Sequence, residues 1–175
     1  MSRIYETSRY AERKTTVFIS HKHDDLEDLK GVLGFLETQY SVKIYIGSRD
    51  SSMPAVTSAE TAATLKKRIG QCDKFILLAT NGAIESKWCN WELGFGDAKR
   101  FREHIALFPM KPEGTHDVLY KGNEYFSIYP YIRYSDGTEY CTDGRPIDRG
   151  YYVVARKDGM DWYTSLGEWF TKRPW

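Results

Sequence analysis

The segment 86–95 carries the residue types and spacing best suited to chemistry. It reads Ser-Lys-Trp-Cys-Asn-Trp-Glu-Leu-Gly-Phe, so a single carboxylate, Glu92, stands among small and aromatic residues. Helical spacing predicts an apolar stripe made up of Ile84, Trp88, Trp91 and Phe95. Cys89, Glu92 and Gly96 then fall on the adjacent face. This pattern predicts that Glu92 borders the core and is not in open solvent.

A carboxylate at the border of a core is costly to desolvate unless it has a partner, a raised pKa or a cationic ligand. The pattern is therefore compatible with a reactive group in a pocket wall. The alternative is a surface glutamate at the edge of an amphipathic helix, and helical spacing alone does not exclude it. The same alternatives exist for Cys89, which we interpret as a buried small residue and not as a nucleophile.

Further polar groups follow the first predicted strand. Ser20, His21 and Lys22 offer a hydroxyl, an imidazole and an ammonium group, which could bind a polar ligand or could line a solvated loop. His21 and His23 lie beside two aspartates, but the sequence shows no second cluster with suitable metal ligands. We expect no metal site.

The segment 47–57 is long for a connection between a strand and a helix, and such connections tend to carry function or to move. It contains Ser48, Arg49 and Asp50. Arg49 is the most attractive anion-binding residue of the chain, because a guanidinium group can hold a phosphate with two hydrogen bonds.

Composition excludes several classes of partner. The 175 residues include 25 basic and 24 acidic side chains, well mixed, with a net charge of +1. We therefore expect no nucleic-acid partner and no attraction to an anionic membrane. The absence of an apolar run or leader predicts a cytoplasmic protein, and three widely spaced cysteines fit neither a disulfide framework nor a zinc site.

The elements that must position these side chains alternate along the chain. Short runs rich in β-branched and aromatic residues predict strands at 15–20, 43–46, 74–79 and 104–108, with 151–155 as a fifth. Helical patterns lie between the first four runs, and Asp161 could cap a last helix with Trp162 on its buried face. Such alternation predicts a parallel sheet with helices on both faces, and ligand sites outside the carboxyl ends of its strands.

The chain is predicted to be a single domain spanning 1–175, with a core at 15–108 and 151–172. The segment at about 114–149 is predicted to be an aromatic-rich insertion before the last strand. Within it, the sequence from Ser135 to Thr138 contains Asp-Gly, which indicates a hairpin between 132–134 and 139–141.

Three segments together resemble a TIR domain of the bacterial, stand-alone kind. The first is Val-Phe-Ile-Ser-His at 17–21 followed by Asp24 and Asp25, the second is Ser-Arg-Asp at 48–50 with Pro54, and the third is 86–93. The resemblance covers roughly 15–108 together with a last strand and helix. It implies an α/β fold of the flavodoxin-like type, a three-layer sandwich with a central five-stranded parallel sheet.

For the catalytic members of that family, the resemblance implies cleavage of the nicotinamide glycosidic bond of NAD+, which is then the substrate, with no cofactor. Glu92 stands where those enzymes keep their essential glutamate, and Trp88 matches an aromatic residue placed near the nicotinamide ribose. Contacts to the ribose and pyrophosphate are implied for Ser20, His21, Lys22, Ser48, Arg49 and Asp50. We expect Glu92 to be ionised at neutral pH and to stabilise positive charge on the ribose.

Stand-alone bacterial proteins of this kind serve in antiviral defence of the Thoeris type, where they make a nucleotide signal for a separately encoded effector. The resemblance also implies a homo-oligomer formed through contacts between TIR domains. Two other interpretations remain open: a non-enzymatic interaction module, and an enzyme similar to nucleoside deoxyribosyltransferases. The sequence does not identify the nucleophile, so the product could be ADP-ribose, a cyclic isomer or a conjugate.

Overall fold

A computed structural model describes residues 13–46, 58–99, 102–110 and 121–172. Its centre is a seven-stranded sheet with the strand order β2-β1-β3-β4-β5-β6-β7. The strands are β1 (Thr16–Ser20), β2 (Lys43–Tyr45), β3 (Lys74–Ala79), β4 (Ile105–Pro109), β5 (Tyr131–Ser135), β6 (Gly150–Lys157) and β7 (Met160–Ser165). The predicted α/β fold with a central parallel sheet is confirmed, but the sheet has seven strands, not five.

The first five strands in the spatial order run parallel to one another. Strand β6 runs antiparallel to both of its neighbours, β5 and β7. The fifth parallel strand is β5, which lies inside the segment predicted as an insertion. The strand predicted at 151–155 belongs to β6 and runs in the opposite direction. This part of the sequence therefore extends the sheet beyond its parallel part.

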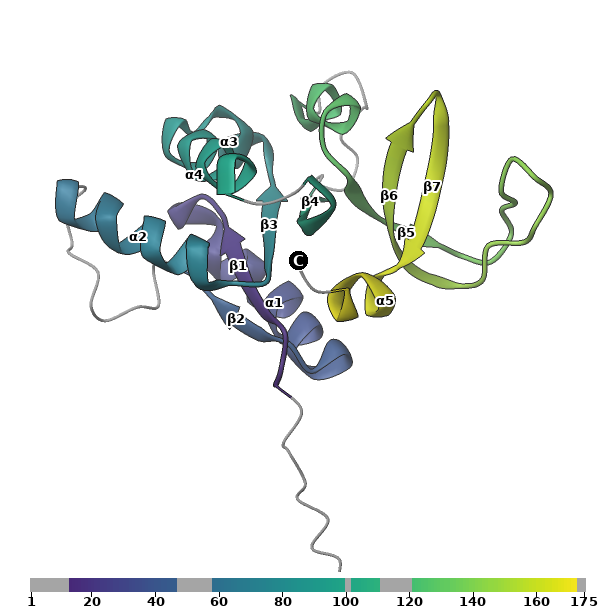
Figure 1. The fold of residues 1–175 in the computed structure, drawn as a ribbon, viewed down its shortest axis with the longest axis horizontal. Helices are drawn as coiled ribbons and strands as arrows, with labels where there is room; N and C mark the ends of the chain where they lie inside the picture. Colours follow the sequence, from purple (N-terminus) through teal and green to yellow (C-terminus); the bar gives the residue numbers. More distant parts are fainter. Residues whose placement is uncertain (1–12, 47–57, 100–101, 111–120, 173–175) are drawn as a thin grey trace, which may run out of the picture.

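Helices cover both faces of the sheet (Figure 1). The helical segments are η1 (His23–Asp25), α1 (Leu26–Tyr40), α2 (Ala59–Gln71), α3 (Asn81–Glu85), α4 (Lys87–Lys99), η3 (Arg102–His104), η5 (Lys121–Ser127) and α5 (Leu166–Thr171). One core joins α1 and α5 to the sheet through Leu33 and Trp169, and a second core joins α2, α3 and α4 to the other face. Alternate residues of β1 supply both cores, since Phe18 faces the second core while Val17 and Ile19 face the first.

The last part of the chain differs from its prediction. Residues 160–165, expected to begin a helix capped by Asp161, form β7, which pairs with β6 through a two-residue turn. That turn is Asp158-Gly159, and both residues have positive φ angles, 54° and 75°, as a type I′ hairpin turn requires. Only Leu166–Thr171 is helical, and its N-cap is Ser165.

The prediction of a hairpin around Ser135 is also wrong. Asp136 and Gly137 do form a turn, in which the Asp136 carboxylate accepts a hydrogen bond from the backbone N–H of Thr138 at 2.9 Å. However, β5 pairs with β6 and not with 139–141. The chain between them makes a wider excursion closed by an isolated bridge between Tyr140 and Pro146.

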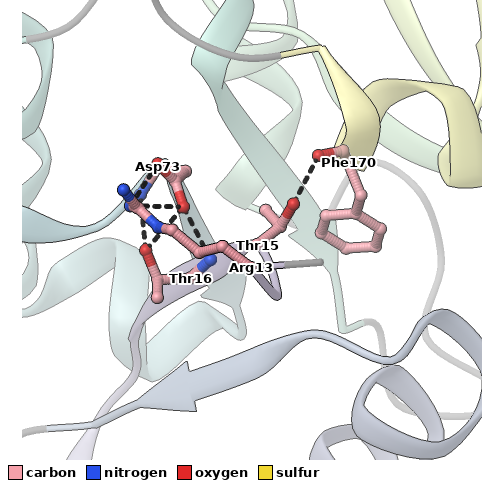
Figure 2. Close-up of polar contacts among 5 residues, drawn as sticks. All are labelled: Arg13, Thr15, Thr16, Asp73 and Phe170. Carbon is pink, nitrogen blue, oxygen red and sulfur yellow. Dashed lines mark hydrogen bonds and ion pairs between the residues drawn. The ribbon is translucent and has the colours of Figure 1, made fainter. Parts of the chain in front are cut away.

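Asp73 fixes the start of β3 against the start of β1 (Figure 2). Its Oδ2 accepts hydrogen bonds from the backbone N–H of Thr16 at 2.9 Å and from the Thr16 hydroxyl at 2.8 Å. The Arg13 guanidinium contacts the same carboxylate at 3.0 Å, and the neighbouring Thr15 hydroxyl donates to the Phe170 carbonyl at 2.9 Å. These contacts join β1, β3 and α5, so they fix the register of the two central strands.

Replacing Asp73 with alanine should lower the free energy of unfolding by about 2 to 3 kcal/mol, because it removes the acceptor from several part-buried donors at once. Urea unfolding followed by circular dichroism measures the change. Asp143→Ala is the matched control, since Asp143 is exposed and bonds only locally to Arg145; it should cost less than about 0.5 kcal/mol. Equal losses in the two variants would contradict this role of Asp73.

Candidate active site

Helix α4 packs closely against the sheet through small side chains. A Cβ atom at Gly96 would lie 3.1 Å from the ring of Phe75 on β3, so a larger residue would fit only if the ring shifted by a few tenths of an ångström. The buried residues of α4 are Cys89, Glu92, Leu93 and Gly96. The expected arrangement is therefore reversed: the face that carries Glu92 is the one turned to the sheet.

The aromatic stripe lies at the side of α4 and is half-buried. The rings of Trp88 and Trp91 stack with centroids 4.8 Å apart, and those of Trp91 and Phe95 lie 6.0 Å apart. The Lys66 ammonium of α2 stands 5.7 Å from the Trp91 ring, a distance at which a cation and a ring attract each other. Ile84 belongs to α3, so it does not continue this ladder along one helix.

Ser20 and Glu92 meet at the carboxyl end of β1. The Ser20 hydroxyl donates a short hydrogen bond to the Glu92 carboxylate, and the two residues are 1% and 5% exposed. Within the described part of the chain, Ser20 is the one hydrogen-bond donor to this carboxylate, and no cation pairs with it. A buried carboxylate with one neutral partner is an uncommon arrangement, because burial of a charge is normally offset by an ion pair.

Burial raises the pKa of Glu92 to about 7, and the hydrogen bond from Ser20 opposes this rise. Near pH 7 the neutral form of this carboxylate is therefore populated in the unliganded protein. The sequence led us to expect full ionisation at neutral pH, and desolvation of the side chain is the reason for the difference. A cation placed beside Glu92 would lower its pKa and restore the charge.

Cys89 lies one turn from Glu92 and is 1% exposed. Burial raises the pKa of its thiol, and the nearby Glu92 carboxylate acts in the same direction. Its thiolate is therefore disfavoured, which agrees with the interpretation of Cys89 as a buried small residue.

The loops after β1 and β3 are joined next to this site. The Thr80 hydroxyl donates to the Asp25 carboxylate at 2.5 Å and accepts a hydrogen bond from the backbone N–H of Ala83 at 2.9 Å. Gly82 lies against Lys22, where a Cβ atom would come within 2.8 Å of the lysine Cδ. A larger residue at 82 would have to displace the Lys22 side chain.

The structure brings some of the predicted site residues together, and others lie outside the described part of the chain. Ser20 and Glu92 are in direct contact, and Trp88 lies one helical turn before Glu92 on α4. His21 and Lys22 follow directly after β1 and are half-buried. The remaining three, Ser48, Arg49 and Asp50, lie outside the described residues.

A tyrosine of the predicted insertion packs on this region, which the sequence did not reveal. The Tyr125 hydroxyl donates to Asn90 Oδ1 at 2.8 Å, and the Asn90 amide donates to the Ile84 carbonyl, also at 2.8 Å. Tyr125 thus braces the junction between α3 and α4. No local pattern predicts such a contact, because 35 residues separate the two partners.

Among the described residues, no group of three or more histidine, cysteine or acidic side chains is arranged to hold a metal ion. No helix in the described ranges is long and apolar enough to cross a bilayer.

Comparison with known proteins found a relative by sequence similarity. The chain is 30% identical over 118 residues to the probable 3′ cyclic ADP-D-ribose synthase ThsB′ of Bacillus cereus (strain MSX-D12), and the match covers 66% of this chain and 59% of that protein. Over this stretch the chain is similar in sequence to ThsB′. It spans about 59% of the length of the curated relative it matches. No family model matches this chain.

Two solved structures are similar in shape to parts of this chain. The TIR domain of the Toll-related receptor TRR-2 from Hydra magnipapillata is 19% identical, with a TM-score of 0.44 over 59% of this chain and 76% of that chain. A prokaryotic SEFIR domain is 13% identical, with a TM-score of 0.44 over 59% and 72% of the two chains.

Glu92 should make stability depend on pH. Its pKa is about 7 when folded and near 4.5 otherwise, so its contribution is fully present below pH 4.5 and is lost as the pH rises through 7. The Glu92→Gln variant has no ionisable group at this position, so it does not lose this stability as the pH rises. The variant should therefore gain about 2 to 3 kcal/mol relative to the wild type between pH 5 and pH 8.

Urea unfolding at the two pH values measures this difference. The exposed Glu37→Gln serves as the control and should show no comparable gain. Ser20→Ala, which removes the hydroxyl that lowers the pKa, should enlarge the loss of stability at pH 8. A wild type and a Glu92→Gln variant with parallel pH profiles would mean that Glu92 keeps an ordinary pKa.

Proposed function

We propose that this chain cleaves the bond between nicotinamide and ribose in NAD+, with Glu92 as the catalytic carboxylate. The observation that carries the proposal is the burial of Glu92 with a hydroxyl, and no described cation, as its partner. Such a group is suited to a ligand that brings its own positive charge. The name of the relative, a probable cyclic ADP-ribose synthase, supports the same substrate class.

The chemistry requires stabilisation of positive charge. When the C1′–N bond breaks, its electron pair goes to the ring nitrogen and nicotinamide leaves as a neutral molecule. The ribose then carries oxocarbenium character, which an adjacent carboxylate stabilises electrostatically. Glu92 would also accept hydrogen bonds from the ribose hydroxyls, and no proton donor is needed for the leaving group.

The raised pKa of Glu92 fits this role. The nicotinamide ring of bound NAD+ is cationic, so its approach favours the ionised carboxylate. Ser20 would keep the carboxylate in place as its charge changes, because the hydroxyl can donate to it in either state. Because the carboxylate is desolvated, the charge of Glu92 would depend on whether substrate is bound.

The other predicted residues would hold the rest of the substrate. Trp88 lies one turn from Glu92 and would pack against nicotinamide or its ribose. His21 and Lys22 would contact the ribose and the pyrophosphate from the loop after β1. The same contacts are proposed for the residues of the segment 48–50.

The nucleophile decides the product. Water would give ADP-ribose, whereas an internal adenine nitrogen or ribose hydroxyl would attack C1′, and loss of one proton from the resulting adduct would give a cyclic isomer. We favour a cyclic nucleotide signal made in antiphage defence and read by a separately encoded effector, because the relative is named as a cyclic ADP-ribose synthase. The active form is proposed to be a homo-oligomer, whose specific activity would rise with protein concentration.

Glu92→Gln should lower the rate of nicotinamide release from NAD+ by at least about 100-fold, the usual effect of removing one electrostatic stabiliser of a transition state. The neutral amide has the shape of the carboxyl group, so the fold should be retained, as circular dichroism can verify. Glu37→Gln, an exposed exchange on α1, is the control. A folded Glu92→Gln variant with the wild-type rate would show that Glu92 is not the catalytic carboxylate, whereas the absence of nicotinamide release by the wild type would favour an interaction module.

Mass spectrometry of the products from NAD+ should reveal an isomer of cyclic ADP-ribose, which is lighter than ADP-ribose by one water molecule. Supplying the wild-type protein with nicotinamide riboside in parallel tests whether a nucleoside suffices as substrate. Recovery of ADP-ribose alone would contradict the signalling product while leaving the cleavage chemistry intact.

A further inference from the structure

A cavity of about 700 Å³ lies at the opposite end of the sheet from Glu92. It is formed where η3 enters β4, where Pro130 precedes β5, and where β6 and α5 end. Its basic lining residues are Arg102, His104, Arg156, Lys157 and Lys172. This volume lies within the range of small-molecule sites in proteins, about 300 to 1,000 Å³.

The sheet register separates this cavity from the proposed active site. Lys74, which contacts the cavity residue His104, stands at the start of β3 opposite Val17, whereas Ser20 pairs with Leu77 three residues further along. Three residues of a strand span about 10 Å. The side chains that line the cavity therefore differ from those around Glu92.

The inner wall is held by buried polar contacts. His104 is 3% exposed, and its Nδ1 lies 2.7 Å from the Nζ of the fully buried Lys74. An ammonium group only donates, so Nδ1 accepts and the ring proton is assigned to Nε2. The Lys74 ammonium also stands 4.6 Å from the ring of Trp169, whose Nε1–H donates to the Glu103 carbonyl at 2.6 Å.

The rim is positively charged and partly fixed. Arg156 is held by Asp161, with Nε 2.9 Å from Oδ1, and the Arg102 guanidinium donates to the Ser127 carbonyl at 3.4 Å. Lys157 and Lys172 are exposed and form no ion pair with another described residue. Glu103 is the acidic residue in the lining, so the cations outnumber the carboxylates even when Asp161 is included.

The walls also offer apolar surface. Pro130 is buried and Ala155 is half-buried, and the long basic side chains of the lining also carry aliphatic stems. A bare inorganic anion would use the charges of the rim but leave these walls empty. A ligand that fits both features has a flat apolar body and a phosphate group, which guanidinium groups bind with particular geometry.

We propose that this cavity is a second, non-catalytic site for a small phosphorylated molecule of the size of a nucleoside monophosphate. The phosphate would lie among Arg102, Lys157 and Lys172 at the rim, and the flat body would lie against Pro130 and Ala155. The proposal does not depend on NAD+ cleavage, because it concerns other residues and is tested by binding.

Isothermal titration calorimetry with AMP as the probe tests the site. Lys157→Glu combined with Lys172→Glu should weaken AMP binding by at least about 10-fold, through loss of attraction and added repulsion. Lys67→Glu, which makes one exchange of the same kind on the exposed side of α2 and matches Lys157→Glu alone in charge, should bind AMP like the wild type. Adenosine and inorganic phosphate should each bind at least about 10-fold more weakly than AMP.

Circular dichroism verifies that the doubly substituted protein is folded, and Lys157→Glu alone provides a milder variant. AMP bound at the substrate site would persist in both variants, so an unchanged affinity in these folded proteins overturns the proposal. Absence of AMP binding to the wild type does so too, as does adenosine binding as tightly as AMP.

Discussion

The burial of a single carboxylate constrains how the central strands and helix α4 of this protein must be placed. Glu92 is 5% exposed and receives one hydroxyl, from Ser20, as its described hydrogen-bond partner. For the two to meet, the end of β1 and the middle of α4 must be held at a fixed separation. The contacts of Asp73 hold β1 against β3, and the absence of a side chain at Gly96 lets α4 settle on β3.

Much of this could be predicted from the sequence, because the signals concerned are local. The runs of apolar and β-branched residues that form β1, β3 and β4 are short, continuous and covered on both faces. Parallel strands place their carboxyl ends at one edge, so the proximity of Ser20 to the helices after β3 followed from topology. The direct contact between Ser20 and Glu92 required the coordinates.

The failures have equally specific causes. Helical spacing gives the angle between side chains but not which side meets the sheet, so it predicts the side with the large rings of Trp88 and Trp91 as the buried one. At the C-terminus, the spacing of Trp162, Leu166 and Trp169 indicated one helix, although Asp158-Gly159 is a typical hairpin turn. The pairing of β5 with β4 rests on a single residue pair, Leu107 with Tyr131, and has no local signature.

The close packing at Gly96 bears on how related sequences should be compared. A homologue could retain Glu92, Ser20 and the surrounding tryptophans and still carry alanine or serine at position 96. The ring of Phe75 or the helix itself would then have to shift by a few tenths of an ångström, and a shift of the helix would move Glu92 relative to Ser20. A search that inspects only polar residues would score such a sequence as intact, so this glycine should be read together with the glutamate when enzymes are sorted from adaptors.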